Sequence, residues 1–389
     1  MAVRGDGENG EDKGDESDEQ HTWPEALLPA QAAREWIATS LPGNPPVVGP
    51  LIVHQAKEWG ATASFATLDA QTTASGAHSG REVILKLSTL PLFAAAPRLA
   101  ALLHAAAPDA MPEVIAWDQR DGLSLTLFQP FEGRPVSEVH ALAPLLETAR
   151  TLARIQVAMA ALPPDETASL LRTPVAQIPR LFDTVLRDVY ERQMAYWAGT
   201  DTGRAIARQF ALPPDLPARL EAVRPHIAAW AAELASGPWP ETVDHVDLHG
   251  ENAVLRTAAD GSILIFDWEE AVLSAPFFSL DRLLNDAREL DLGERAAWSP
   301  DSAPDAALYT PSEVALRDAY LAALPWGTPA ARERAFALAM ALAPIKAAYE
   351  GIELGEALGW DAADSSFGTA WALARALPRW QALMSSETG

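Results

Sequence analysis

The sequence predicts an α+β protein in which a small lobe rich in antiparallel strands precedes a larger, mainly helical lobe. Between residues 47 and 128, short apolar runs alternate with turn residues, whereas after residue 130 apolar residues recur at helical spacing. The chain has 389 residues, 49% of them hydrophobic, which is enough for two lobes with buried cores. We expect a disordered acidic tail at 1–22, the first lobe at 23–130 and the helical lobe at 131–389.

The first twenty residues differ in composition from the rest of the chain. They contain a single Val, no aromatic residue and eight acids, which are Asp6, Glu8, Glu11, Asp12, Asp15, Glu16, Asp18 and Glu19. Such a segment buries too little apolar surface to offset the entropy lost on ordering, so a disordered tail is expected.

The first lobe begins near Trp23 with a helix that continues to about Ser40. Its apolar residues fall at helical spacing, and Pro42-Gly43 ends it. One further helix is expected at 97–106. The strand candidates are 51–53, 64–68, 82–87 and 123–128, separated by turn residues.

The second lobe reads as a series of helices, each with one apolar face. The expected segments are 142–156, 181–190, 215–234, 311–324, 329–358 and 370–384. Pro217 suits the first turn of the third of these, because the first turn does not use the backbone N–H that proline lacks.

Composition excludes several classes of function. The chain has no Cys, which excludes disulfides, thiolate nucleophiles and Cys-ligated metals and suits a reducing cytoplasm. A net charge of −24 disfavours binding to nucleic acid or anionic membranes. Residues 1–20 lack the apolar core of a secretory signal, and the longest apolar stretch, 335–345, is too short to span a bilayer. We expect a cytoplasmic protein without nucleic-acid or membrane partners.

One segment of the second half, residues 242–268, is not helical in pattern. Two strand candidates, Ala253–Arg256 and Ile263–Phe266, enclose the turn signal Asp260-Gly261. A hairpin centred between residues 259 and 260 would place Asn252 and Asp267 side by side at its open end. Asp247 precedes Asn252 by five residues, so three oxygen-bearing side chains can converge.

This set of side chains suits phosphoryl transfer. Mg²⁺ prefers oxygen ligands and keeps water and phosphate oxygens, so Asn252 and Asp267 suffice as protein ligands. Asp247 could then orient a hydroxyl and accept its proton. Lys86, in the apolar run 82–87, could bind phosphates, although an edge-strand lysine that prevents aggregation explains it equally well.

The motif His245-x-Asp247-x-x-x-x-Asn252, followed by Ile265-Phe266-Asp267-Trp268, resembles the catalytic and metal-binding motifs of the aminoglycoside phosphotransferase and choline kinase superfamily. The resemblance covers roughly residues 40–290. It implies a two-lobed, protein-kinase-like fold and transfer of a phosphoryl group from ATP, with Mg²⁺, to a hydroxyl of a small polar molecule.

The resemblance also implies roles for individual residues. These are Asp247 as catalytic base, Asn252 and Asp267 as Mg²⁺ ligands, Lys86 at the α- and β-phosphates, Gln129 to Phe131 at the adenine, and His245 with His249 as support of the loop. Nearby acids, Glu251, Glu269 and Glu270, would suit a cationic acceptor, and solvated surface charge is their alternative explanation.

Two departures from the family pattern give further expectations. No acidic residue lies between 92 and 107, where the partner of Lys86 is expected, which leaves a nucleotide-binding pseudokinase with a regulatory or scaffolding role as an alternative. Val246 stands where the family usually has Gly, and because a branched residue disfavours positive φ, we expect an ordinary backbone conformation there. A metallohydrolase is a further alternative, because His245, Asp247 and His249 alternate as zinc ligands can.

Overall fold

The structure, a computed structural model, describes residues 22–43, 47–68, 80–209, 212–257, 261–293, 309–360 and 362–387. The predicted acidic tail lies outside the described residues. The chain divides into two compact units, Met1–Lys86 and Leu87–Gly389. The boundary predicted near residue 130 stays a prediction.

The first unit pairs a helix with antiparallel strands. It contains α1 (Ala30–Ser40), β1 (Val47–Lys57), β2 (Gly60–Leu68) and most of β3 (Gly80–Ser88). β1 and β2 form a hairpin with two register irregularities. The indole of Trp23 meets the ring of Phe65 edge-on, with centroids 5.7 Å apart, and both side chains are buried. Residues 23–29 are turns rather than the predicted start of the helix.

The second unit begins with a short helical turn, η1 (Pro91–Phe93), and α2 (Ala96–Ala106), which lead into a hairpin of β4 (Val114–Arg120) and β5 (Leu123–Phe128). Asp121 and Gly122 both have positive φ (51° and 77°), the backbone that a two-residue turn between twisted strands requires. The sequence predicted β5 at its observed bounds and missed β4.

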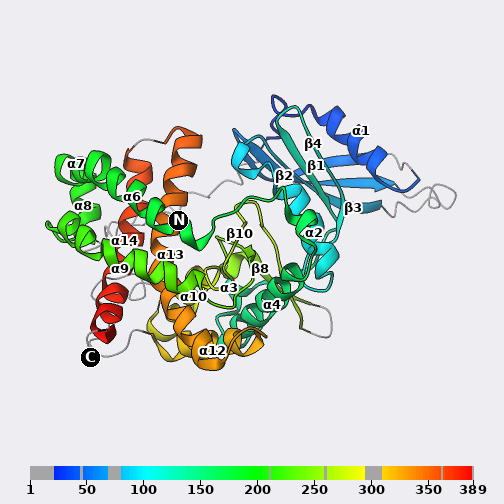
Figure 1. The fold of residues 1–389 in the computed structure, drawn as a ribbon. Coiled ribbons are helices and arrows are strands. Elements are labelled where there is room, and N and C mark those ends of the chain that lie inside the picture. Colours follow the sequence, from blue (N-terminus) through cyan, green and yellow to red (C-terminus); the bar gives the residue numbers. More distant parts are fainter. Residues whose placement is uncertain are drawn as a thin grey trace, which may run out of the picture. The chain divides into compact units, whose positions relative to one another are not determined.

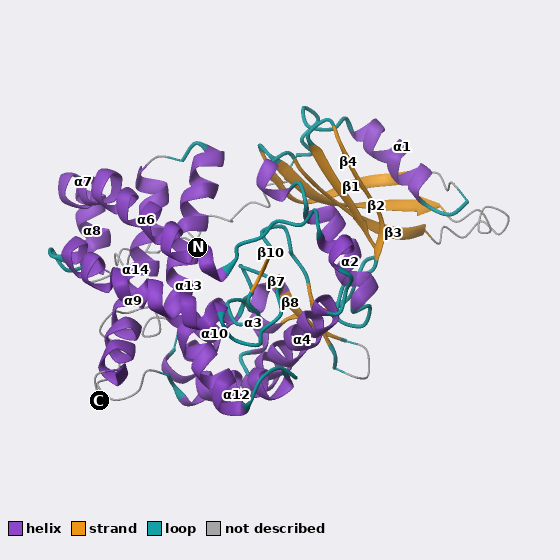
Figure 2. Cartoon of the chain, viewed as in Figure 1, coloured by secondary structure: helices purple, strands orange, loops and turns teal. Residues whose placement is uncertain are grey.

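Helices make up most of the second unit (Figures 1 and 2). They are α3 (Val136–Val139), α4 (Leu142–Ala160), α5 (Pro164–Thr167), η2 (Val175–Gln177), α6 (Ile178–Asp188), the π-turn η3 (Val189–Gln193), α7 (Met194–Gly199), α8 (Asp201–Gln209), α9 (Leu216–Ala235), α10 (Leu280–Leu292), α12 (Pro311–Ala323), α13 (Pro329–Leu358) and α14 (Ala362–Glu387).

Short strands between α9 and α10 carry the predicted site. They are β7 (Thr242–Asp244), the turn η4 (Gly250–Asn252), β8 (Ala253–Arg256), β9 (Ile263–Ile265) and β10 (Val272–Ser274). β8 pairs with β9 on one side and with β6 (Gly133–Pro135) on the other, and β7 pairs with β10. The helix α4 packs against β7, β9, α10 and α12, so this irregular segment rests on the helical core.

The helix α13 is long and apolar enough to cross a membrane by length and composition alone. In the structure most of this helix is buried against α6, α9 and α14. It also carries a buried lysine, Lys346, whose role becomes clear at the site.

Candidate active site

The β8–β9 hairpin sets the positions of the two predicted metal ligands. Ala253 pairs with Ile265, and the N–H of Phe266 donates to the carbonyl of Asn252 at 3.0 Å. The direct neighbour of Asn252 is therefore Phe266, and Asp267 follows one residue later. The expectation that Asn252 and Asp267 face each other across the hairpin is wrong by one residue, because the pattern of strand residues does not set the register through the turn.

Asp267 lies on an unusual stretch of backbone. Its φ is 64° and its side chain is exposed, whereas Asn252 is buried. The amide nitrogen of Asn252 donates to the carbonyl of Asp247 at 2.8 Å. This bond fixes the orientation of the Asn252 amide.

The loop of residues 245–252, which carries the predicted base Asp247 and is called the catalytic loop below, contains a strained turn at Val246. The N–H of Asp247 donates to the carbonyl of His245 at 2.8 Å, and the residue between them has φ 69°. An i→i+2 bond around a positive φ defines the rare, strained form of the γ-turn. The expected ordinary conformation of Val246 is therefore wrong. A branched residue in this region costs about 1–3 kcal/mol, which surrounding contacts must offset.

Asp247 lies between a guanidinium and an imidazole. Nη1 of Arg282, on α10, forms an ion pair with Oδ1, and Nε2 of His249 lies 3.7 Å from Oδ2. Burial alone would raise the pKa of Asp247, but hydrogen bonding to His249 and the charge of Arg282 outweigh it and hold the pKa below its usual range. Asp247 is thus a carboxylate at neutral pH.

The same contacts act on His249 in the opposite sense. Burial lowers its pKa, but the hydrogen bond and charge of Asp247 overcome this, and the net direction is upward. His249 also contacts the amide nitrogen of Asn252 at 3.2 Å. His249 thus links the predicted base to a predicted metal ligand.

Gly250 allows the loop to pack closely on its surroundings. Its N–H donates to Oδ2 of Asp286 at 2.6 Å, and a Cβ at this position would lie 2.7 Å from the backbone N of Ser137. Burial raises the pKa of Asp286 to about 6 even though the Gly250 bond opposes the shift. A larger residue at 250 would therefore displace α3 or the loop.

His245 turns away from the other two polar side chains of its motif. It is fully buried, its Nε2 hydrogen-bonds the carbonyl of Phe266 at 2.9 Å, and its ring centroid lies 4.3 Å from that of Trp268. Burial lowers its pKa, which favours the neutral ring. His245 therefore does not converge with Asp247 and His249 as a zinc site requires. No group of three His, Cys, Asp or Glu residues in the described part of the chain could hold a metal ion.

The predicted nucleotide-binding residues fall in both units. Lys86 lies half-buried in β3 of the first unit. In the second unit, Phe131 precedes β6, and its ring centroid lies 5.4 Å from that of Phe266, beside Asp267. The N–H of Gln129 donates to the carbonyl of Glu113 at 2.9 Å. The helix α2 carries Arg98 and no acid, as its sequence shows.

Sequence reasoning named Glu270 near the site but gave it no partner. Burial raises its pKa to about 7, and the charges of Asp247, Glu350 and Asp267 add to the shift while Arg282 opposes it. Arg282 and Glu350 were missed altogether. They come from helices 35 and 103 residues beyond Asp247, and no local pattern marks them.

Residues 57–333, most of the chain, match the model of a family described as the phosphotransferase enzyme family. The chain belongs to this family. It is accordingly a small-molecule kinase, as its motifs predicted. No curated protein matches the chain.

Solved structures agree on the fold. The chain is similar to an ethanolamine kinase of Plasmodium vivax (TM-score 0.52, 10% identity, covering 92% of this chain and 87% of that one) and to a choline kinase of Cryptosporidium parvum (0.52, 10%, 92% and 97%). It is also similar to aminoglycoside 2′-phosphotransferase-IIIa in its GDP complex (0.50, 11%, 87% and 94%). The two-lobed α+β fold predicted from the motifs is confirmed.

Proposed function

We propose that this kinase transfers the γ-phosphoryl group of ATP to a hydroxyl of a small polar acceptor, with Asp247 as the base. The observation that carries the proposal is the environment of Asp247, an ionised carboxylate held by Arg282, by His249 and by a turn in its own backbone. A fixed carboxylate of this kind can orient a hydroxyl toward the phosphorus atom.

In the proposed step the acceptor oxygen forms a bond to the γ-phosphorus while the bond to the β,γ-bridging oxygen breaks and ADP leaves. The hydroxyl proton passes to Asp247. Because the pKa of Asp247 is low, the carboxylate is a weak base and takes the proton late, when the acceptor oxygen has become acidic. The chain therefore contributes mainly orientation and electrostatics.

Asn252 and Asp267 fit Mg²⁺ in the chemistry of their donors. Each offers oxygen, Asp267 lies one residue beyond the direct neighbour of Asn252 at the end of the hairpin, and the amide of Asn252 is oriented by its bond to Asp247. When bound, Mg²⁺ would neutralise phosphate charge. In the same proposal Lys86 contacts the α- and β-phosphates, and the backbone from Gln129 to Phe131 receives the adenine.

The proposal is tested with Asp247→Asn. Loss of the carboxylate should lower kcat by about 10²- to 10⁴-fold with little change in ATP binding. ATP turnover should be measured with a panel of aminoglycosides, choline, ethanolamine and sugars. Glu221→Gln, which changes an exposed acid of α9 outside the loop, is the control.

Two results would contradict the proposal. An unchanged rate for Asp247→Asn would remove Asp247 from the mechanism. ATP binding by the unaltered protein without turnover of any acceptor, even at high protein concentration, would favour the pseudokinase alternative.

A further inference from the structure

A buried carboxylate lies directly beneath the strained turn of the catalytic loop. Oδ1 of Asp244, the last residue of β7, accepts a hydrogen bond from the N–H of Val246 at 3.2 Å and another from the hydroxyl of Ser279 at 2.8 Å. The same Ser279 hydroxyl accepts from the N–H of His245 at 2.9 Å. Two consecutive N–H groups at the γ-turn are thus held, directly or through Ser279, by one carboxylate.

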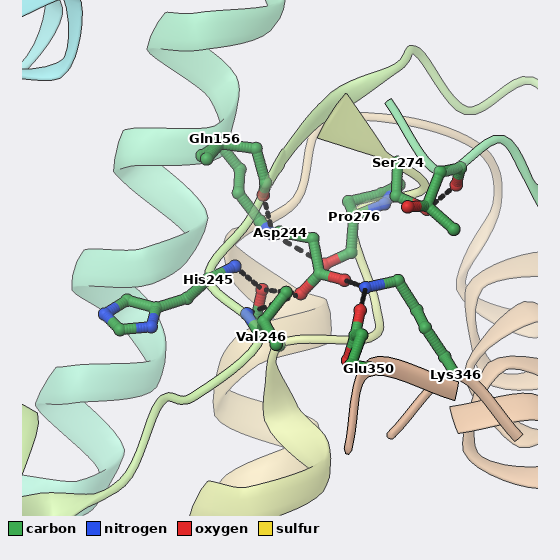
Figure 3. A network of polar contacts seen from close by, with 11 residues as sticks. Gln156, Asp244, His245, Val246, Ser274, Pro276, Lys346 and Glu350 are labelled. Carbon is green, nitrogen blue, oxygen red and sulfur yellow. Dashed lines mark hydrogen bonds and ion pairs between the residues drawn. The ribbon is translucent and has the colours of Figure 1, made fainter. Parts of the chain in front are cut away.

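The other oxygen of this carboxylate meets a lysine from a distant helix. Nζ of Lys346, on α13, lies 2.9 Å from Oδ2 of Asp244 and also forms an ion pair with Glu350 (Figure 3). The side chains of Lys346 and Asp244 are only 4% and 1% exposed. We call Asp244, Ser279 and Lys346 the loop strut.

Neighbouring contacts hold β7 in place around the strut. The amide of Gln156, on α4, donates to the carbonyl of Pro276 at 2.7 Å (Figure 3). It also donates to the carbonyl of Val243 at 2.9 Å and accepts from the hydroxyl of Tyr320 at 2.6 Å. The strand before the turn is therefore fixed independently of the strut, and the strut acts on the turn itself.

Stability alone does not explain a buried ion pair at this place. Removing lysine and aspartate from water is costly, and apolar side chains of similar size stabilise a core equally well or better. Unlike an apolar side chain, a carboxylate accepts hydrogen bonds, so it can fix the positions of specific N–H groups. Those groups belong to His245 and to Val246, whose branched side chain disfavours the φ that it adopts.

We infer that the loop strut is a positioning device that holds Val246 in its left-handed conformation and thereby orients the carboxylate of Asp247. The effect on turnover rests on the proposed function, whereas the effect on the turn does not. Glycine at 246 would adopt the same φ without a side-chain penalty, so a chain with glycine there would not need the strut.

The test combines removal of the strut with removal of the strain. Lys346→Met should lower kcat at least tenfold with little change in the KM for ATP, because the base is displaced while nucleotide contacts remain. Adding Val246→Gly should restore most of that loss. A loss of global stability alone would lower the folded fraction and not the kcat of the folded enzyme, so recovery of kcat on adding Val246→Gly would trace the loss to the turn.

A second readout is independent of activity. Site-resolved hydrogen exchange of the full-length protein follows the N–H of Asp247, which closes the turn on the carbonyl of His245. Its protection should fall at least tenfold in Lys346→Met and return in the double variant. If Lys346→Met does not fold, Ser279→Ala is used in its place with the same expectation, because it removes only the hydroxyl that links the N–H of His245 to the carboxylate of Asp244.

Arg288→Met is the matched control, since it breaks another ion pair with a buried partner, Glu313, away from the catalytic loop. It should lower thermal stability without opening the turn. The inference is overturned if the turn stays protected in the folded strut variants, or if Val246→Gly fails to restore protection in them. Absence of turnover in the unaltered protein would count against the proposed function only, and exchange would still decide the role of the strut.

Discussion

At the scale of single residues, Val246 adopts a backbone conformation that its branched side chain disfavours. Its φ of 69° closes the turn before Asp247 at a cost that glycine would avoid. Replacing Val246 by Gly relieves about 1–3 kcal/mol of strain and loses roughly 0.5–1 kcal/mol to the freer unfolded chain. Val246→Gly should therefore raise the free energy of unfolding by about 1 kcal/mol in urea denaturation. Val272→Gly, in the extended strand β10, should lower it, and stabilisation of both would contradict the account.

Asp286 gives a prediction on pH. Its pKa is raised from 3.8 to about 6, so between these values the folded protein binds a proton that the unfolded chain releases. The contribution of Asp286 to stability is therefore fully present below pH 4 and is lost as pH rises through 6. Asp286→Asn keeps an oxygen for the N–H of Gly250 and removes this dependence. The free energy of unfolding of Asp286→Asn relative to the unaltered protein should increase by up to about 3 kcal/mol from pH 4 to pH 8, and a constant difference would contradict the shift.

At the scale of elements, the sequence predicted helices with an apolar face well. It did not predict which distant residues their side chains contact. The sequence placed a helix at 329–358, and α13 has these bounds. The short helices α7 and α8 went unpredicted, as did the short strands β7 and β10, because few residues at helical or strand spacing mark such elements. The 13-residue helix α10 was also missed. Asp281 lies in the first turn of α10.

The partner of Asp281 could not be named from the sequence. It is Arg379 on α14, 98 residues away, at 2.7 Å, and both side chains are buried. Arg379 also donates to the carbonyl of Met340, a helical acceptor that Pro344 in α13 leaves without its usual N–H. One side chain thus joins three helices, a property that depends on tertiary packing alone.

This contact predicts a large loss on truncation. Arg379→Met leaves the carboxylate of Asp281 buried without its partner, which typically costs about 3–5 kcal/mol. The exposed pair Arg219–Asp215 provides the comparison, and Arg219→Met should cost no more than about 1 kcal/mol. Chemical denaturation measures both. Equal losses in the two variants would show that burial of the Asp281–Arg379 pair does not increase its contribution to stability. Adding Asp281→Asn to Arg379→Met should recover part of the larger loss.

At the scale of the whole molecule, the motifs predicted the fold because the chemistry of the site is local in sequence. Asp247, Asn252 and Asp267 lie within 21 residues, and the last two stand at the open end of one hairpin, offset by one residue from direct pairing. Arg282, which pairs with Asp247, comes from α10, and Lys346 of the loop strut comes from α13. No spacing rule in the sequence marks either residue. A sequence of this kind therefore indicates candidate catalytic residues but not the distant groups that contact them.

The last prediction concerns the stability of the whole protein when ligand binds. A nucleotide that binds only the folded protein stabilises it by about 2.7 kcal/mol at a concentration of 100 Kd. If Asn252 and Asp267 hold Mg²⁺, part of the rise in Tm with ATP should require Mg²⁺. Asp267→Asn should remove most of that part because the amide lacks the negative charge, while its Tm without ligand changes little, since the side chain is exposed. Glu251→Gln should keep the full Mg²⁺-dependent rise, and an equal rise in Asp267→Asn would place the metal elsewhere.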